Sequence, residues 1–249
     1  MRKLLSILLA VLAFLSCSAK VKDYKVEVLE SYPHDRGAYT QGLFFHADTL
    51  YETTGQYGES TLRKLDLRSG EVLEKVSFSR KYFAEGSCML DGNIYILTWT
   101  SKVAFVYDGA SFKYARTWSY PREGWGLTTD GEFLYASDGS NAIYVLSKDF
   151  KLQRTIRVKV DGRPLRWLNE LEWVDGKIWA NVYTTDMIAV INPESGEVEA
   201  RIDCSGLLPE KLRNPDTDVL NGIAVNSKGE IFLTGKYWPK LYKVKLSRK

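Results

Sequence analysis

The chain has 249 residues, of which 45% are hydrophobic and 26% charged, the composition of an ordinary globular protein long enough to bury a large core. Its net charge is only +3 and no block of Lys and Arg occurs, so nucleic acid is not an expected partner. The only histidines are His34 and His46, which argues against a histidine triad or a histidine-rich metal site.

The N-terminus has the pattern of an export signal. A positive start, Met1-Arg2-Lys3, precedes an apolar run over residues 4–15 that is too short to span a bilayer stably. The stretch FLSC, ending at Cys17, resembles a bacterial lipobox, and ordinary cleavage near Ala19 is the alternative. We therefore expect residues 1–19 to be a signal, favouring Cys17 as a lipidated mature N-terminus.

Residues 20–249 are then expected to be one exported domain, located in the periplasm or held at the outer membrane of a bacterium. A lipid on Cys17 would be its sole membrane contact, because no other membrane-spanning run follows. A monomer is the default expectation.

Beyond the signal, short alternating or apolar runs are separated by turn residues, which is typical of an all-β protein. A turn followed by a strand with an early aromatic residue recurs along the chain. The aromatic positions are Tyr51, Tyr95, Tyr135, Trp179 and Phe232. A period of about 40–45 residues is that of a four-stranded propeller blade, so the repeat predicts a five-bladed β-propeller.

The last repeat stops after its third strand. Residues 24–29, YKVEVL, have the pattern of a strand and can supply the missing outer strand of the last blade, which closes the ring and removes an exposed edge. The spacing before the last repeat is longer because of an insertion from Cys204 to Leu220, rich in Pro, Asn and Asp. We interpret this insertion as a surface loop.

Two rings of equivalent positions follow from the repeat. A short motif before each first strand places Gln41, Glu85, Trp125, Asn169 and Asn221 in the first ring. The second ring, 14 or 15 residues further along, consists of Gly55, Trp99, Gly139, Tyr183 and Lys236. A strand, a turn and a returning strand fit this offset. Both rings are therefore expected at one end of the central channel, with the glycines leaving open space.

The residues at this end of the channel indicate a functional site rather than a purely structural one. Carboxamides could merely bond neighbouring blades and tryptophans could merely pack between them, but a lone Glu85 near Lys236 has no such explanation. Burial against Phe83, Trp99 and Trp125 should raise the pKa of Glu85 by desolvation, which suits proton transfer near neutral pH.

The neighbours of Glu85 suit the same chemistry. Gln41, Asn169 and Lys236 are donors that could hold a carbonyl group and its developing oxyanion.

Nucleophilic and metal-based catalysis are less well supported. No Ser or Cys has an obvious base. Cys88 and Cys204 could pair after export, but we favour two unpaired buried side chains, and without a CxxC pattern or a Cys/His cluster no zinc site is indicated.

Five stretches resemble the plant and bacterial type of glutaminyl cyclase. They are YTQGL from Tyr39, FAEG from Phe83, NELE from Asn169, WANVY from Trp179 and LTGKYWPK from Leu233. The resemblance extends over nearly the whole mature chain. It implies a five-bladed propeller that converts the N-terminal glutamine of peptides or proteins to pyroglutamate and releases ammonia.

The resemblance also implies roles for individual residues. Glu85 would pass a proton from the substrate α-amine to the leaving amide nitrogen, while Gln41, Asn169 and Lys236 orient the substrate and polarise its γ-carbonyl. The substrate-binding positions would be Tyr39, Phe83, Trp99, Trp125, Tyr183 and Asn221. Tyr39 and Tyr183 depart from the phenylalanine and tryptophan of the plant form, which bears on substrate preference and rate.

No cofactor is expected for this reaction, and no metal is expected at the site. A structural Ca²⁺ in the channel is compatible with the fold, although no motif identifies one. Two alternatives remain. One is a metal-dependent lactonase-like propeller with Glu85, Asn169 and Asn221 as oxygen ligands, and the other is a non-catalytic lipoprotein that binds peptide or glycan.

Overall fold

The computed structural model describes residues 20–249, so the expected signal and Cys17 lie outside the described residues. The regular elements of the described chain are β-strands, apart from one short 3₁₀ helix, η1 (Glu210–Leu212). No helix within residues 20–249 has the length and hydropathy needed to cross a membrane.

Three four-stranded antiparallel sheets follow one another along the chain. The first consists of β2 (Thr40–His46), β3 (Thr49–Thr54), β4 (Thr61–Leu65) and β5 (Val72–Ser77). The second consists of β6 (Ala84–Leu90), β7 (Asn93–Thr98), β8 (Val103–Asp108) and β9 (Tyr114–Ser119). The third consists of β10 (Leu127–Thr129), β11 (Leu134–Ser137), β12 (Ala142–Leu146) and β13 (Leu152–Arg157).

The remaining long strands form one eight-stranded sheet in the order β16-β17-β18-β19-β1-β22-β21-β20. Its members are β16 (Leu168–Val174), β17 (Lys177–Val182), β18 (Met187–Ile191), β19 (Val198–Asp203), β20 (Leu220–Val225), β21 (Ile231–Gly235), β22 (Lys240–Arg248) and β1 (Lys22–Pro33). A small hairpin of β14 (Lys159–Val160) and β15 (Arg163–Pro164) precedes β16.

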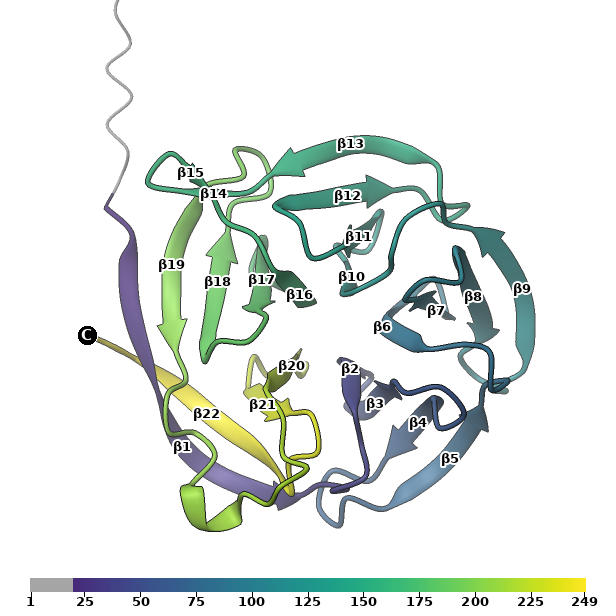
Figure 1. Ribbon diagram of the computed structural model, residues 1–249, viewed down its shortest axis with the longest axis horizontal. Coiled ribbons are helices and arrows are strands. Elements are labelled where there is room, and N and C mark those ends of the chain that lie inside the picture. Colours follow the sequence, from purple (N-terminus) through teal and green to yellow (C-terminus); the bar gives the residue numbers. More distant parts are fainter. Residues whose placement is uncertain (1–19) are drawn as a thin grey trace, which may run out of the picture.

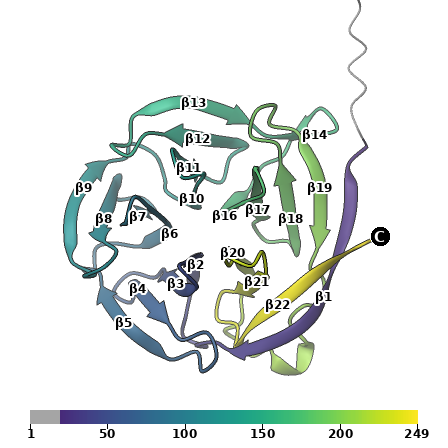
Figure 2. The same ribbon diagram turned by 180° about the vertical axis from the view of Figure 1, so that it is seen from behind.

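The sheets stand around a common centre in a β-propeller-like arrangement, with β2, β6, β10, β16 and β20 innermost (Figure 1). Each of these inner strands contacts the next, and β20 returns to β2, so the ring of contacts is closed. The view from behind shows the same order (Figure 2). The all-β prediction is confirmed.

The predicted pairing of the N-terminal strand with the last strand of the chain is also confirmed. β1 pairs antiparallel with β22, from Tyr24 opposite Arg248 to Pro33 opposite Lys240, so the first and last strands of the described residues share one sheet. The strand is longer than expected and also runs parallel to β19 through Lys22 to Lys25. That second pairing joins the two halves of the eight-stranded sheet.

The apolar core lies in layers between neighbouring sheets. Leu43 of β2, for example, packs in one cluster with Phe232 of β21. Most of the insertion at 204–220 is exposed or half-buried, as expected of a surface loop, but Leu207 and Leu208 are buried in a cluster with Trp238. The burial of these two leucines was not predicted, because the rest of the segment is rich in polar residues.

Candidate active site

The polar residues of the first ring occupy irregular points of the inner strands. The pairing register shifts between Thr40 and Gly42, between Ala84 and Ser87, between Leu168 and Leu171, and between Leu220 and Ile223. Gln41, Glu85, Asn169 and Asn221 each fall within one of these shifts. A bulge frees a residue from the regular ladder and redirects its side chain, which explains how a polar group begins a core strand.

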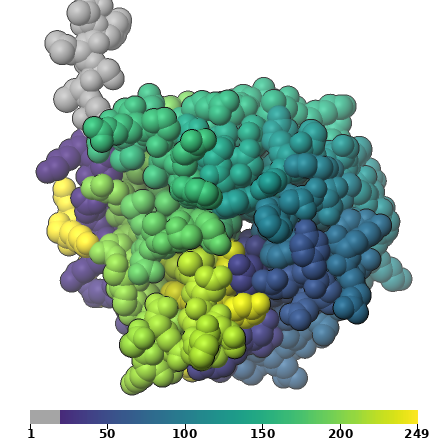
Figure 3. Space-filling model, viewed as in Figure 1, coloured from purple at the N-terminus to yellow at the C-terminus, as the bar shows by residue number. Residues whose placement is uncertain are grey.

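A cavity of about 440 Å³ opens at this end of the inner strands. Its polar lining includes Gln41, Glu85, Asn169 and Lys236. Its aromatic lining includes Tyr39, Phe83, Trp99, Trp125 and Tyr183. The two sequence rings therefore meet at one end of the ring of strands, and the space-filling view shows a small opening at the centre of the molecule (Figure 3).

Asn221 is the one site residue expected from sequence that does not line this cavity. It is fully buried, and its side-chain nitrogen donates to the Thr40 carbonyl at 2.9 Å and to Oε1 of Gln41 at 3.3 Å. Asn221 thus lies behind Gln41, where it orients the carboxamide that does face the cavity.

The Glu85 carboxyl is buried at the wall of the cavity. Within residues 20–249 it has no hydrogen-bond partner for its side-chain oxygens, although its backbone carbonyl accepts a bond from Thr53. Loss of solvation raises its pKa well above the usual range; nearby Lys236 opposes this shift and Glu123 adds to it. The expected direction of the shift is confirmed, with its expected cause.

Lys236 carries the opposite charge into the same cavity. Its Nζ lies 4.5 Å from the ring centroid of Tyr39 and 5.0 Å from that of Tyr183, so two aromatic faces enclose the ammonium group. Burial lowers the pKa of Lys236, while Glu85 and Asp218 hold it up. In the described part of the chain, no carboxylate forms an ion pair with this lysine.

One carboxylate oxygen positions two walls of the cavity. Oε2 of Glu123 accepts the indole N–H of Trp99 at 3.0 Å and that of Trp125 at 3.2 Å. Glu123 precedes β10 and Trp99 follows β7, so this contact ties two neighbouring sheets together at the mouth. On the other side, the Tyr39 hydroxyl donates to Asp218 at 3.2 Å.

The two glycines of the second ring do not leave open space, which corrects the sequence interpretation. A Cβ atom on Gly55 would lie 2.3 Å from the ring of Phe83, and one on Gly139 would lie 2.7 Å from the ring of Trp125. Gly139 also has φ +76°, a conformation that glycine adopts readily. The glycines allow aromatic rings to pack tightly and so shape the wall.

Sequence reasoning missed four residues of this region: Gln56, Glu123, Trp167 and Asp218. Gln56 and Trp167 line the cavity, and both have a positive φ. Glu123 lies two residues before a ring position, which was a usable signal. Asp218 lies in the 204–220 insertion, and nothing in its sequence context separates it from neighbouring surface acids.

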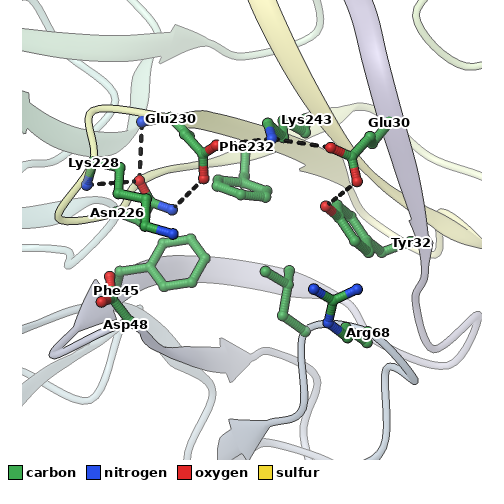
Figure 4. A pocket seen from close by; sticks show the side chains of 11 residues that line it. Glu30, Tyr32, Phe45, Asp48, Arg68, Asn226, Lys228, Glu230, Phe232 and Lys243 are labelled. Carbon is green, nitrogen blue, oxygen red and sulfur yellow. Dashed lines mark hydrogen bonds and ion pairs between the residues drawn. The ribbon is translucent and has the colours of Figure 1, made fainter.

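A second cavity, of about 280 Å³, lies at the opposite ends of β2 and β20, beyond Phe45 and Asn226. Three of its charged side chains form ion pairs (Figure 4): Lys243 contacts Glu30 at 3.0 Å and Glu230 at 2.8 Å. The Tyr32 hydroxyl also donates to Glu30 at 2.7 Å. These contacts join β1, β22 and the turn before β21, whereas Glu85 and Lys236 form no ion pair within residues 20–249.

Cysteine and metal chemistry have little support among residues 20–249. Cys88 and Cys204 are both free and buried, as favoured from sequence, with Cys204 directly after β19. Burial raises the pKa of the Cys88 thiol, which disfavours the reactive thiolate. No three His, Cys, Asp or Glu side chains in this part of the chain gather in a geometry that could hold a metal ion.

Comparisons with known proteins agree on one family. A family model described as "Glutamine cyclotransferase" matches residues 3–246. A glutaminyl-peptide cyclotransferase of Arabidopsis thaliana is 40% identical over 232 residues, which covers 90% of this chain and 72% of the relative. The crystal structure of Myxococcus xanthus glutaminyl cyclase matches with a TM-score of 0.86 and 36% identity, covering 92% of this chain and all of that one.

Proposed function

The chain belongs to the glutamine cyclotransferase family, and we propose that it closes the N-terminal glutamine of peptides or proteins to pyroglutamate through the cavity around Glu85. It is an acyltransferase, because the γ-acyl group of glutamine passes from the side-chain nitrogen to the α-nitrogen. The placement of the site is supported by the buried Glu85 carboxyl and the buried Lys236 ammonium, which face one aromatic cavity and have no hydrogen-bond or ion-pair partner within residues 20–249.

The reaction needs one proton transfer within the substrate. The α-amine nitrogen attacks the γ-carbonyl carbon, and Glu85 takes a proton from that amine. The bond from this carbon to the side-chain nitrogen then breaks. Glu85 returns the proton to the departing nitrogen, which leaves as ammonia. The carboxyl ends in its starting state and no water is consumed, so a single acid-base group is sufficient.

The donors around Glu85 suit the charge that develops on the γ-carbonyl oxygen. Lys236 offers an ammonium group, and Gln41 and Asn169 offer carboxamide N–H groups. Asn169 has no side-chain hydrogen bond to another part of residues 20–249, and Gln41 is held from behind by Asn221. Donors already fixed in a mostly buried site stabilise an oxyanion with little reorganisation.

We also propose that the sheets make up a five-bladed propeller. Division of the eight-stranded sheet between β19 and β1 leaves two units of four strands each, β16 to β19 and β20 to β22 with β1. The division is supported by strand direction, because β19 and β1 pair parallel, whereas every pairing within a unit is antiparallel.

The placement of the chain in the cell is a further proposal, supported by the N-terminal pattern alone. We propose that it is exported, with a lipid on Cys17 as the membrane anchor. Incorporation of labelled palmitate by the full chain, and its loss in Cys17→Ala, would be the expected result. An unlabelled but exported protein would contradict the anchor and favour cleavage near Ala19.

The activity is tested by incubating the protein with glutamine dipeptide amides and measuring ammonia together with product mass, with and without EDTA. We expect ammonia and the pyroglutamyl product in equal amounts, unchanged by EDTA. Glu85→Gln should form neither, and the exposed-site control Glu132→Gln should match the parent protein. Loss of product with EDTA would favour a metal-dependent propeller enzyme, and peptide binding without ammonia would favour a binding protein.

A further inference from the structure

Trp167 is the most exposed residue lining the active-site cavity. Its side chain is 56% exposed, compared with 37% for Trp99, whereas the other lining residues are buried or half-buried. Its ring centroid lies 6.2 Å from that of Trp125 and 6.5 Å from that of Tyr183. An aromatic surface therefore continues from the cavity wall to the solvent at this side of the mouth.

The backbone holds Trp167 in this position. Its φ is +67°, a left-handed conformation that is unfavourable for a bulky side chain. Two hydrogen bonds fix the peptide there: the Trp167 N–H donates to the Gly139 carbonyl at 2.8 Å, and the Tyr183 N–H donates to the Trp167 carbonyl at 2.8 Å. A strained, hydrogen-bonded residue that still exposes its indole is a candidate for ligand contact rather than for core packing.

The chemistry of the proposed reaction directs the rest of the peptide toward this mouth. Cyclisation uses the α-amine and the γ-carbonyl of the first residue, so both must lie in the cavity near Glu85. The α-carbonyl, with the remainder of the peptide attached, must leave through the opening. The second residue of the substrate consequently meets the exposed aromatic rim.

We propose that Trp167 forms a subsite for the side chain of the second substrate residue and that this subsite favours large apolar or aromatic side chains. The inference rests on the proposed function. An exposed indole face gains contact area from an apolar side chain and gains nothing from glycine. In addition, within residues 20–249 the indole N–H of Trp167 has no acceptor, so it is free to bond the backbone of the peptide.

The test compares kcat/KM for Gln-Phe amide and Gln-Gly amide. We expect the parent protein to favour the phenylalanine substrate by about tenfold, in keeping with the contribution of one apolar contact. In Trp167→Asn the preference should fall to less than about twofold. The change should come mainly from a higher KM for Gln-Phe amide, because kcat is determined by the groups around Glu85 and not by Trp167. Asparagine tolerates a positive φ, so this variant is expected to fold.

Two further variants make the result specific. Trp167→Phe keeps an aromatic face and should keep most of the preference. Tyr114→Ala removes another exposed aromatic side chain, 57% exposed on the outer strand β9, and should leave the preference unchanged. A tenfold preference retained in Trp167→Asn, or no preference in the parent protein, would overturn the subsite while leaving the cyclase activity in place. No ammonia from either peptide would overturn the proposed function itself.

Discussion

At the scale of single residues, the charge of Glu85 is set by its neighbours. Burial raises its pKa, Glu123 raises it further and Lys236 lowers it. Glu123→Gln should therefore lower the pKa of Glu85, and Lys236→Met should raise it. A carbon-13 NMR titration of the Glu85 carboxyl, assigned by its disappearance in Glu85→Gln, measures both shifts without requiring activity.

The opposite pKa shifts expected for Glu85 in Glu123→Gln and Lys236→Met distinguish an electrostatic effect from a general disturbance of the site. Glu71→Gln removes an equal charge at an exposed turn and should leave the Glu85 titration unchanged. Shifts of the same sign in Glu123→Gln and Lys236→Met would contradict the electrostatic assignment, since the two variants remove opposite charges.

The raised pKa of Glu85 also predicts a stability cost for the site. Above the unfolded-state pKa of about 4.3, the unfolded chain releases a proton that the native state retains, so the free energy of unfolding falls as pH rises until the folded-state pKa is passed. Glu85→Gln cannot titrate at this position and so lacks this pH-dependent loss of stability. Above the unfolded-state pKa, the free energy of unfolding of Glu85→Gln relative to that of the parent protein should therefore increase with pH, while turnover is lost.

Urea unfolding at several pH values between 4 and 9 checks this prediction, because the other titrating groups are common to both proteins. A difference that stays constant across the range would show that the Glu85 carboxyl has the same pKa in the folded and unfolded states.

At the scale of elements, buried carboxyl groups join the inner strands at their bulges. Glu170 of β16 accepts the Leu43 N–H of β2 at 3.3 Å and the Ile223 N–H of β20 at 2.9 Å. Glu172 of the same strand accepts the Val225 N–H at 3.0 Å, and burial raises its pKa to about 8. In Glu170, each carboxylate oxygen accepts one of the two backbone N–H groups, so both oxygens are needed as acceptors.

Glu170→Gln tests this joining of strands. An amide NH₂ group cannot accept a hydrogen bond, so one backbone N–H would stay buried without a partner. We expect the free energy of unfolding to fall by about 1–3 kcal/mol. The same substitution at the exposed Glu132 should change it by less than about 0.5 kcal/mol. Equal midpoints in urea for the two variants would argue against the role of Glu170.

At the scale of the whole molecule, the ring is closed by pairing of β1 with β22, the first and last strands of residues 20–249. Removal of residues up to Pro33 would leave the edge of β22 unpaired, and we expect the truncated chain to aggregate or remain unfolded. The Lys249 N–H donates to the Asp23 carbonyl at 2.9 Å, so the ends of β22 and β1 are already adjacent.

A circular permutant makes this prediction specific. It would begin near His34 and carry β1 after Lys249, joined by a short Gly-containing turn suited to antiparallel strands. Circular dichroism and size-exclusion chromatography should show a folded, non-aggregating protein with cyclase activity. A truncated chain that folds as well as the permutant would show that β1 is not required for closure.

Much of the fold could be predicted from sequence because each repeat carries its own local signals. The turn and aromatic strand around Tyr95 or Tyr135 marks a unit, and the absence of a fourth strand after Val244 predicted the use of residues 24–29. Within the surface insertion at 204–220, the burial of Leu207 and Leu208 was not predicted, because it depends on Trp238, which is distant in the sequence.

The sequence by itself determined the β class, the repeat, the closing strand and most of the cavity lining, because equivalent positions in repeats point to the same end of a ring. Tertiary structure alone decided which groups meet across sheets. It brought Glu123 to the indoles of Trp99 and Trp125, placed Asn221 behind Gln41 and filled the space beside Gly55 and Gly139 with aromatic rings. These contacts depend on side-chain direction and on the approach of neighbouring sheets, neither of which a one-dimensional pattern records.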